Sequence, residues 1–186
     1  MEERAARFRR LLEPHHDRVL GFARSLCRAI SEGDDLFQDA MVRAFAKLDA
    51  LRDDAAFRPW LYRIVVNAHR SRCRRTFWRR LIPLVAEPDT DDEADAEQLY
   101  RTEAWSPIAR DANRRARAAL ARLPVATREA IVLFEIEGWQ VEEIATLQQS
   151  SISAVKSRLA RGRDRLRALY DEQPSLTSTQ IQGDTP

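Results

Sequence analysis

Hydrophobic side chains recur at three- and four-residue steps along most of the chain, which is the period of an α-helix and not of a β-strand. The clearest stripe lies in the span 36–48 and consists of Leu36, Phe37, Ala40, Met41, Ala44, Phe45 and Leu48. Segments rich in Val, Ile and Thr that alternate with polar residues are missing from the sequence, so strands have little support. The pattern therefore predicts an all-α protein.

Helices are also predicted on both sides of that stripe. Asp17 is expected to cap a helix that carries apolar residues up to Ile30, and Gly33 is expected to break it. The span 51–57 is predicted to be a loop. After it, a helix is predicted from Arg58 to about Arg75, because Pro59 suits a first turn and apolar residues gather on one side.

The second half of the chain predicts four more helices. The first starts near Asp111 and stops at Pro124, and the second is capped by Thr127 and ended by Gly138. A short helix is expected at 140–147. A long last helix, capped by Ser151, is expected to end near residue 170.

Two polar faces are candidates for binding nucleic acid. On the helix at 58–75, a straight polar stripe about 16 Å long is expected from a rise of 1.5 Å per residue, and it consists of Arg63, Asn67, Arg70 and Arg74. Nearby aromatic residues are of the kind on which unpaired bases stack, and they are Trp60, Tyr62, Phe77 and Trp78. Ordinary solvation of the stripe, with Trp60 and Tyr62 in the core, is the alternative.

The last two helices predict a helix-turn-helix, because a short helix is followed by a longer basic one after three or four residues. The polar residues of the last helix that are expected to reach DNA are Ser153, Lys156, Ser157, Arg158 and Arg161. The alternative is a solvated basic face on a helical hairpin. Six basic residues against one acidic residue between Lys156 and Arg167 favour the DNA-binding interpretation.

Charge divides the 186 residues into segments, although the net charge is only +2. The span 1–80 holds 18 basic and 11 acidic residues, 81–111 holds 2 and 9, and 112–186 holds 11 and 9. We therefore expect a basic helical domain at 1–80, an acidic linker at 81–111, a second domain at 112–170 and a disordered tail at 171–186. Basic domains indicate a polyanionic partner.

Several classes of function have little support. No apolar run is long enough to cross a membrane and no secretion-type leader is evident, so we expect a soluble cytoplasmic protein without membrane insertion. Cys27 and Cys73 are expected to be free thiols, neither of them at ligand spacing from a histidine, so no metal site is predicted. Phosphate-binding loops and hydrolase motifs are missing, and we expect neither a cofactor nor catalysis.

Two acidic pairs, Asp34-Asp35 and Asp53-Asp54, offer the remaining option for a divalent metal. Adjacent carboxylates at the start of a helix more often complement the helix dipole. We therefore interpret both pairs as helix-start residues.

Three ordered motifs stand out, and they are GDDLFQDAMVRAF at 33–45, FRPWLYRIVVNAHRSRCRR at 57–75, and the span 123–166 with EEIA at 142–145 and VKSRL at 155–159. Together they resemble the motifs of extracytoplasmic-function (ECF) RNA polymerase sigma factors. The resemblance implies a two-domain transcription initiation factor that brings core RNA polymerase to a class of promoters. Chemistry would be left to the polymerase.

The resemblance also implies roles for individual residues. Asp35, Gln38, Asp39 and Arg43 would dock on the β′ coiled coil of the polymerase, and the second domain would also meet the β flap. The melted −10 strand would be held by Asp53, Phe57, Trp60, Arg63, Asn67, Arg70 and Arg74. The −35 duplex would be read by Ser153, Lys156, Ser157, Arg158 and Arg161. An anti-sigma protein is an expected partner, and the linker would be either a solvated tether or a mimic of nucleic acid.

The turn of the predicted helix-turn-helix departs from the family pattern. Gln148, Gln149 and Ser150 stand where a glycine with apolar neighbours is usual, and a left-handed Gln149 would cost about 1 kcal/mol relative to glycine. Gln140 replaces an expected serine cap. Two other functions stay open, a stand-alone helix-turn-helix regulator and a helical adaptor for acidic proteins.

Overall fold

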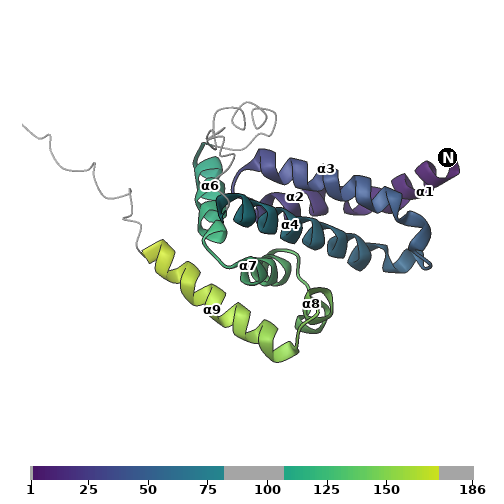
Figure 1. Ribbon diagram of the computed structural model, residues 1–186. Helices are drawn as coiled ribbons and strands as arrows, with labels where there is room; N and C mark the ends of the chain where they lie inside the picture. The colour runs from purple at the N-terminus through teal and green to yellow at the C-terminus, as the bar shows by residue number, and fades with distance from the viewer. Residues whose placement is uncertain (1, 82–106, 172–186) are drawn as a thin grey trace, which may run out of the picture.

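The computed structural model describes residues 2–81 and 107–171. Within these ranges the regular structure is entirely helical, so the predicted all-α class is confirmed (Figure 1). The first block contains α1 (Glu2–Leu12), α2 (His16–Leu26), α3 (Ile30–Ala46) and α4 (Phe57–Leu81), with short turns η1 (Glu13–His15), η2 (Leu48–Ala50) and η3 (Asp54–Ala56). The second block contains α6 (Pro107–Ala121), α7 (Val125–Ile131), η5 (Val132–Ile136), α8 (Val141–Gln148) and α9 (Ile152–Asp171).

Helices α2, α3 and α4 lie side by side and build the core of the first block (Figure 1). Phe22, Leu36 and Leu61 are fully buried in it. The prediction that Gly33 breaks a helix is wrong, because Gly33 lies inside α3. A Cβ at Gly33 would lie 2.5 Å from the Cα of Arg24, so glycine is present where α2 and α3 approach closely.

Helix α7 lies between α4 and α9 and forms the centre of the second block (Figure 1). The prediction that Thr127 caps this helix is wrong, because Pro124 takes the N-cap position and Thr127 is buried inside α7. Helix α7 runs on into the π-helical turn η5, and Gly138 ends this segment with φ of 71°. Gly138 therefore ends the segment as predicted.

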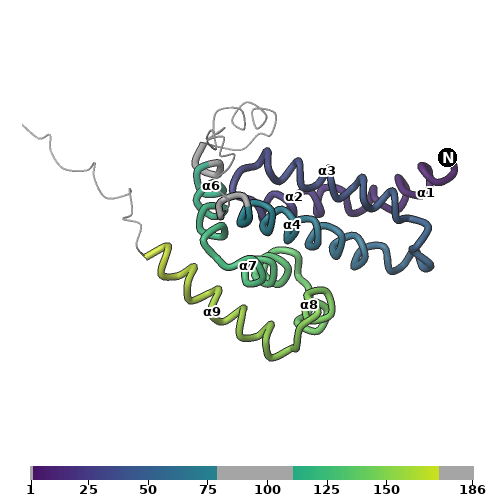
Figure 2. Tube along the Cα trace, in the orientation of Figure 1, coloured from purple at the N-terminus to yellow at the C-terminus, as the bar shows by residue number. Residues whose placement is uncertain are grey.

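The two blocks share one continuous hydrophobic core. The chain trace shows α7 and α8 beside α4 (Figure 2). Helix α4 extends beyond the predicted end at Arg75 to Leu81, and α6 begins at Pro107, before the predicted start near Asp111. The rest of the predicted acidic linker and the tail after Asp171 lie outside the described residues. No helix in the described ranges is long and apolar enough to span a membrane.

Candidate nucleic-acid interface

Helices α8 and α9 form the predicted helix-turn-helix. Gln149 ends α8 with φ of 52° and ψ of 51°, which is the left-handed conformation considered for it. The Oγ of Ser151 accepts a hydrogen bond from the Ala154 backbone N at 3.1 Å, so Ser151 caps α9 as predicted. At the start of α8, the Glu143 carboxylate accepts a hydrogen bond from the Gln140 backbone N at 2.8 Å and compensates for the missing serine cap.

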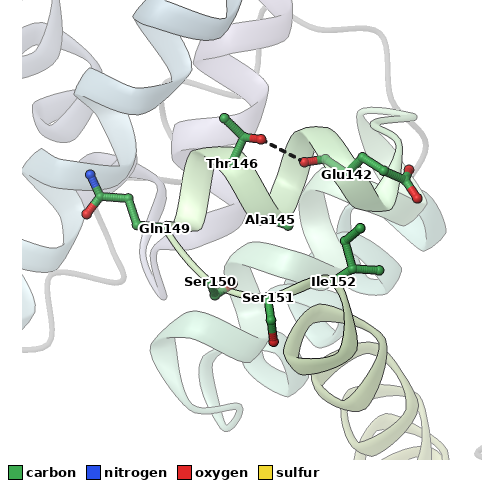
Figure 3. A pocket seen from close by; sticks show the side chains of 7 residues that line it. All are labelled: Glu142, Ala145, Thr146, Gln149, Ser150, Ser151 and Ile152. Carbon is green, nitrogen blue, oxygen red and sulfur yellow. Dashed lines mark hydrogen bonds between the residues drawn. The ribbon is translucent and has the colours of Figure 1, made fainter.

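The turn between α8 and α9 borders an open hollow of about 650 Å³. Figure 3 shows its lining, in which Thr146 Oγ1 donates to the carbonyl of Glu142 at 3.0 Å. The side chain of Gln149 extends away from Ile152 at the start of α9 (Figure 3). The hollow thus lies between the end of α8 and the first turn of α9.

A buried amide holds this turn in place. Gln148 is buried, and its Nε2 donates to the carbonyl of Ala126 at 2.8 Å. Arg158 donates from Nη1 to Gln148 Oε1 at 2.6 Å and to Ser150 Oγ at 2.9 Å. In this arrangement the guanidinium of Arg158 on α9 fixes the turn. Gln148, which departs from the usual family sequence of this turn, therefore has a hydrogen-bond partner on α9.

The polar face of α9 points away from the core. Val155 and Leu159 are buried, which orients the helix, while Ser153, Lys156 and Arg161 are exposed. Ser157 and Arg158 are half-buried. The five predicted residues therefore share one helix, with three of them open to a ligand.

The predicted polar stripe on α4 is also largely accessible. Arg63, Asn67 and Arg74 are exposed, whereas Arg70 is half-buried. Beyond the stripe, the rings of Phe77 and Trp78 are exposed and meet edge to face with their centroids 6.1 Å apart. The stripe thus continues into an exposed aromatic pair of the kind on which bases stack.

The residues before the stripe divide between surface and core. Phe57 has only 1% of its surface exposed and packs against Phe8 and Trp60, with ring centroids 6.1 Å and 5.7 Å away. In this arrangement the Phe57 ring is therefore not accessible to a DNA strand. Trp60 is half-buried, while Asp53 is exposed and accepts a hydrogen bond from the Ala55 backbone N at 2.9 Å.

The two acidic pairs are used by the fold. Asp34 binds Arg24 Nε at 2.6 Å between α3 and α2. Asp54 binds Arg7 Nη2 at 2.6 Å, and the hydrogen bond from Arg7 lowers the pKa of this carboxyl below its usual value. Asp53 caps η3. These carboxylates thus serve as ion-pair and capping groups. The helix-start interpretation holds for Asp53 and Asp54 at η3, but it is wrong for Asp34 and Asp35, which lie beyond the first turn of α3.

The exposed face of α3 carries the residues predicted to dock on the polymerase. Asp35 and Gln38 are exposed, and Asp39 accepts a hydrogen bond from Arg43 Nε at 2.9 Å. Val42 lies on the same face, three residues after Asp39, with 70% of its surface exposed. Val42 was not among the predicted docking residues, although a valine outside the apolar stripe was a visible signal.

A contact between α4 and α7 was not anticipated. Glu129 on α7 has no exposed surface, yet it accepts hydrogen bonds from Arg70 Nε at 3.1 Å and from Arg70 Nη2 at 2.6 Å. Gln148 Nε2 donates to the same carboxylate at 3.3 Å. Arg70 of the predicted strand-binding stripe is therefore held by the second block. In the sequence, burial of Glu129 was indicated by its position four residues before the apolar Leu133, on the apolar side of α7.

Other contacts join the two blocks nearby. Tyr62 donates from its hydroxyl to Glu137 Oε2 at 2.5 Å, and burial together with this hydrogen bond raises the pKa of Tyr62. The guanidinium of Arg58 lies 4.9 Å from the ring centre of Trp139. Arg128 donates to the carbonyl of Leu26 at 2.5 Å. Tyr62 is thus a core residue, as in the alternative interpretation that placed Trp60 and Tyr62 in the core.

The expectation that neither cysteine lies at ligand spacing from a histidine is wrong for Cys73. Cys73 follows His69 by four residues on α4, which brings the Sγ within 3.5 Å of His69 Nε2. Both cysteines are free, with Cys27 buried and Cys73 half-buried. The described residues contain no group of three or more His, Cys, Asp and Glu side chains arranged to hold a metal.

These features define a helical protein with a helix-turn-helix and a second basic helix face, the combination found in DNA-binding transcription proteins. The Sigma-70 region 2 family matches residues 11–79, and the Sigma-70, region 4 family matches residues 113–166. The chain belongs to the sigma-70 family, in the group of ECF RNA polymerase sigma factors. It is a transcription initiation factor that directs RNA polymerase to promoters, and it is not an enzyme.

Relatives and solved structures agree with this assignment. The chain is 35% identical over 162 residues to the ECF RNA polymerase sigma factor SigM of Mycobacterium tuberculosis, covering 87% of this chain and 76% of SigM. It is 32% identical over 152 residues to the ECF RNA polymerase sigma-E factor of Escherichia coli K12, covering 74% of each.

Two solved complexes have similar folds. The sigma factor RpoE in complex with the anti-sigma factor NepR from Bartonella quintana matches with a TM-score of 0.65 and 26% identity, covering 88% of this chain and 96% of that one. CnrH in complex with the cytosolic domain of CnrY matches with a TM-score of 0.62 and 30% identity, covering 89% and 88%.

Proposed function

We propose that this sigma factor contacts promoter DNA through two separate surfaces, one on each helical domain. The first domain would span 1–80 and the second 112–170, joined by the acidic linker 81–111. The observation that carries the proposal is the outward polar face of α9, which presents Ser153, Lys156 and Arg161 beside a well-capped turn. An α-helix of this kind fits the major groove of the −35 duplex.

The stripe on α4 is proposed to hold the melted −10 strand. Arg63, Asn67 and Arg74 offer accessible donors along one side of the helix, and Phe77 and Trp78 offer rings beyond them. Arg70 would join this surface once it leaves Glu129. Asp53 and the half-buried Trp60 lie at the other end of the stripe, whereas Phe57 supports it from the core. Binding the extruded strand lowers the free energy of the open promoter.

The exposed face of α3 is proposed to dock on the β′ coiled coil of core polymerase. Its charged residues flank Val42, whose exposed side chain supplies an apolar centre for an interface. The second domain would also contact the β flap. Because core polymerase is the partner, the protein would act in the bacterial cytoplasm. RpoE and CnrH are each solved with a second protein, and we propose an anti-sigma partner for this chain as well.

In-vitro transcription with purified core polymerase tests the proposal. A genomic fragment library would first identify start sites that depend on the added protein. Arg161→Ala is then expected to reduce transcript from such a site by about fivefold or more, since a lost base contact costs about 1 to 3 kcal/mol. Arg122→Ala, an exposed arginine outside α9, is the matched control and should leave the transcript unchanged.

The alternative functions predict different results. A stand-alone regulator would bind its duplex with full specificity in the absence of polymerase. A helical adaptor would show no salt-sensitive affinity for DNA. Either result, or a library without dependent start sites, would contradict the proposal.

A further inference from the structure

Three side chains from both domains form a chain of contacts beside the Arg70–Glu129 pair. Glu129 Oε1 lies 3.5 Å from His69 Nδ1, and His69 Nε2 lies 3.5 Å from Cys73 Sγ. Glu129 comes from α7, whereas His69 and Cys73 come from α4. The imidazole is almost fully buried, with the Glu129 carboxylate on its Nδ1 side at ion-pair distance and the Cys73 thiol on its Nε2 side, and Nδ1 has no hydrogen-bond partner. Carboxylate, imidazole and thiol in this order are the arrangement that activates a nucleophilic cysteine.

The electrostatics of the three groups agree with that arrangement. The hydrogen bond from His69 lowers the pKa of Cys73, and the charges of His69 and Arg128 act in the same direction, outweighing burial and the charge of Glu129. Burial alone would lower the pKa of His69, but its interactions with Cys73 and Glu129 outweigh burial and raise it. Cys27 provides the contrast, because burial raises the pKa of its thiol to about 12.

We propose that Cys73 is a modification site for small peroxides, assembled where α7 packs on α4. The Cys73 sulfur attacks one oxygen of hydrogen peroxide, the O–O bond breaks, and an S–O bond forms. His69 gives its proton to the departing hydroxide, so the products are Cys73 sulfenic acid and water. The sulfur loses two electrons and the peroxide gains them. The half-buried position of Cys73 admits a small oxidant, while the negative charge of Glu129 beside Nδ1 stabilises the charged imidazole.

The site depends on the association of the two domains. If α7 leaves α4, His69 loses Glu129 and only the His69–Cys73 contact within α4 remains. Cys73 should then react more like an ordinary thiol. This makes Glu129 a positioning residue for the reactive thiol.

The native protein itself gives the first test. Peptide mapping by mass spectrometry would follow alkylation of both cysteines by iodoacetamide at pH 7, in the native and in the urea-unfolded protein. An unperturbed thiol is only about 3% ionised at pH 7, and we expect Cys73 to react about fivefold or more faster in the native state. Cys27 should react more slowly in the native state than in the unfolded one. Dimedone labelling after hydrogen peroxide should mark Cys73 and not Cys27.

Variants test the domain dependence. Glu129→Gln should slow native alkylation of Cys73 by about threefold or more, and a pH series should show a higher pKa for its thiol, because loss of the charged His69 outweighs loss of the opposing charge of Glu129. The control Glu135→Gln removes a carboxylate that binds Arg163 within the second block, and it should leave Cys73 unchanged. A native Cys73 that reacts no faster than in the unfolded protein would overturn the proposal, independently of how Glu129→Gln folds. Unchanged reactivity in a folded Glu129→Gln protein would overturn the role of Glu129.

Discussion

Gln149 lowers the free energy of unfolding because its backbone adopts the left-handed conformation. It is the one non-glycine residue with positive φ in the described ranges, and it ends α8 where glycine is the usual choice. Gln149→Gly should therefore raise the free energy of unfolding by about 1 kcal/mol. For a chain of this size the midpoint of thermal unfolding should rise by about 2 to 4 °C. Calorimetry of the purified protein measures both.

The control for this stability prediction is Glu142→Gly on the same helix. Glu142 is exposed and has ordinary helical geometry, so glycine there should lower stability by about 1 kcal/mol. A Gln149→Gly protein that is no more stable than the parent would show that the left-handed turn costs nothing.

Arg158 and Arg161 lie one helical turn apart but should behave differently. Arg158 binds Gln148 and Ser150, so Arg158→Ala should lower the free energy of unfolding by about 1 to 3 kcal/mol because a buried amide oxygen loses its donor. Arg161 is exposed, and Arg161→Ala should leave stability within about 0.5 kcal/mol. Both variants should weaken promoter binding by the holoenzyme, measured by fluorescence anisotropy. Equal stability of the two proteins would contradict the role of Arg158 in the turn.

At the scale of elements, the helical period located α3, α4, α8 and α9, and Ser151 was recognised as a cap. The errors occurred where tertiary contacts override local signals. Gly33 looks like a helix breaker, but it is present because α2 approaches α3. Thr127 looks like a cap, but it is buried against Gly162 of α9. Propensity acts within a few residues, whereas both positions are decided by a partner helix far along the chain.

The exposed face of α3 makes a prediction about core polymerase. Burying a valine side chain contributes about 1.5 to 3 kcal/mol, and placing a charge there adds a desolvation cost. Val42→Glu should thus weaken binding to core polymerase tenfold or more, measured by competition with the parent protein. Ala6→Glu on an exposed position of α1 is the control. Both variants should keep the parent stability, and undiminished binding by Val42→Glu would remove α3 from the proposed interface.

The arrangement of the whole molecule could not be read from the sequence. Glu129 and Glu137 resemble ordinary surface carboxylates, and their partners Arg70 and Tyr62 lie 59 and 75 residues away. Local patterns carry no information about such distant pairs. The sequence therefore predicted on which helices the candidate residues lie, but not that Arg70 would be occupied by the other block.

This occupancy connects the two proposed DNA-binding surfaces. Arg70 binds Glu129, Gln148 donates to the same carboxylate, and Arg158 donates to Gln148. Arg70 cannot bind a DNA strand fully while its guanidinium holds Glu129 bidentately. Capture of the −10 strand should therefore require α7 to leave α4, which also breaks the contacts of Tyr62 and Arg128.

Glu129→Gln tests whether this closed arrangement limits binding. Glutamine keeps the volume of the side chain but removes the charge that pairs with Arg70. Loss of one partner of a buried ion pair costs up to about 3 to 5 kcal/mol of stability, and the cost is smaller here because Arg70 is partly exposed. The free variant should have a larger radius of gyration in small-angle X-ray scattering, with its helix content retained. Its apparent affinity for core polymerase and promoter should rise, because a larger fraction of molecules is already open. Glu135→Gln should match the parent, and a compact Glu129→Gln protein with parental affinity would mean that domain closure does not compete with DNA.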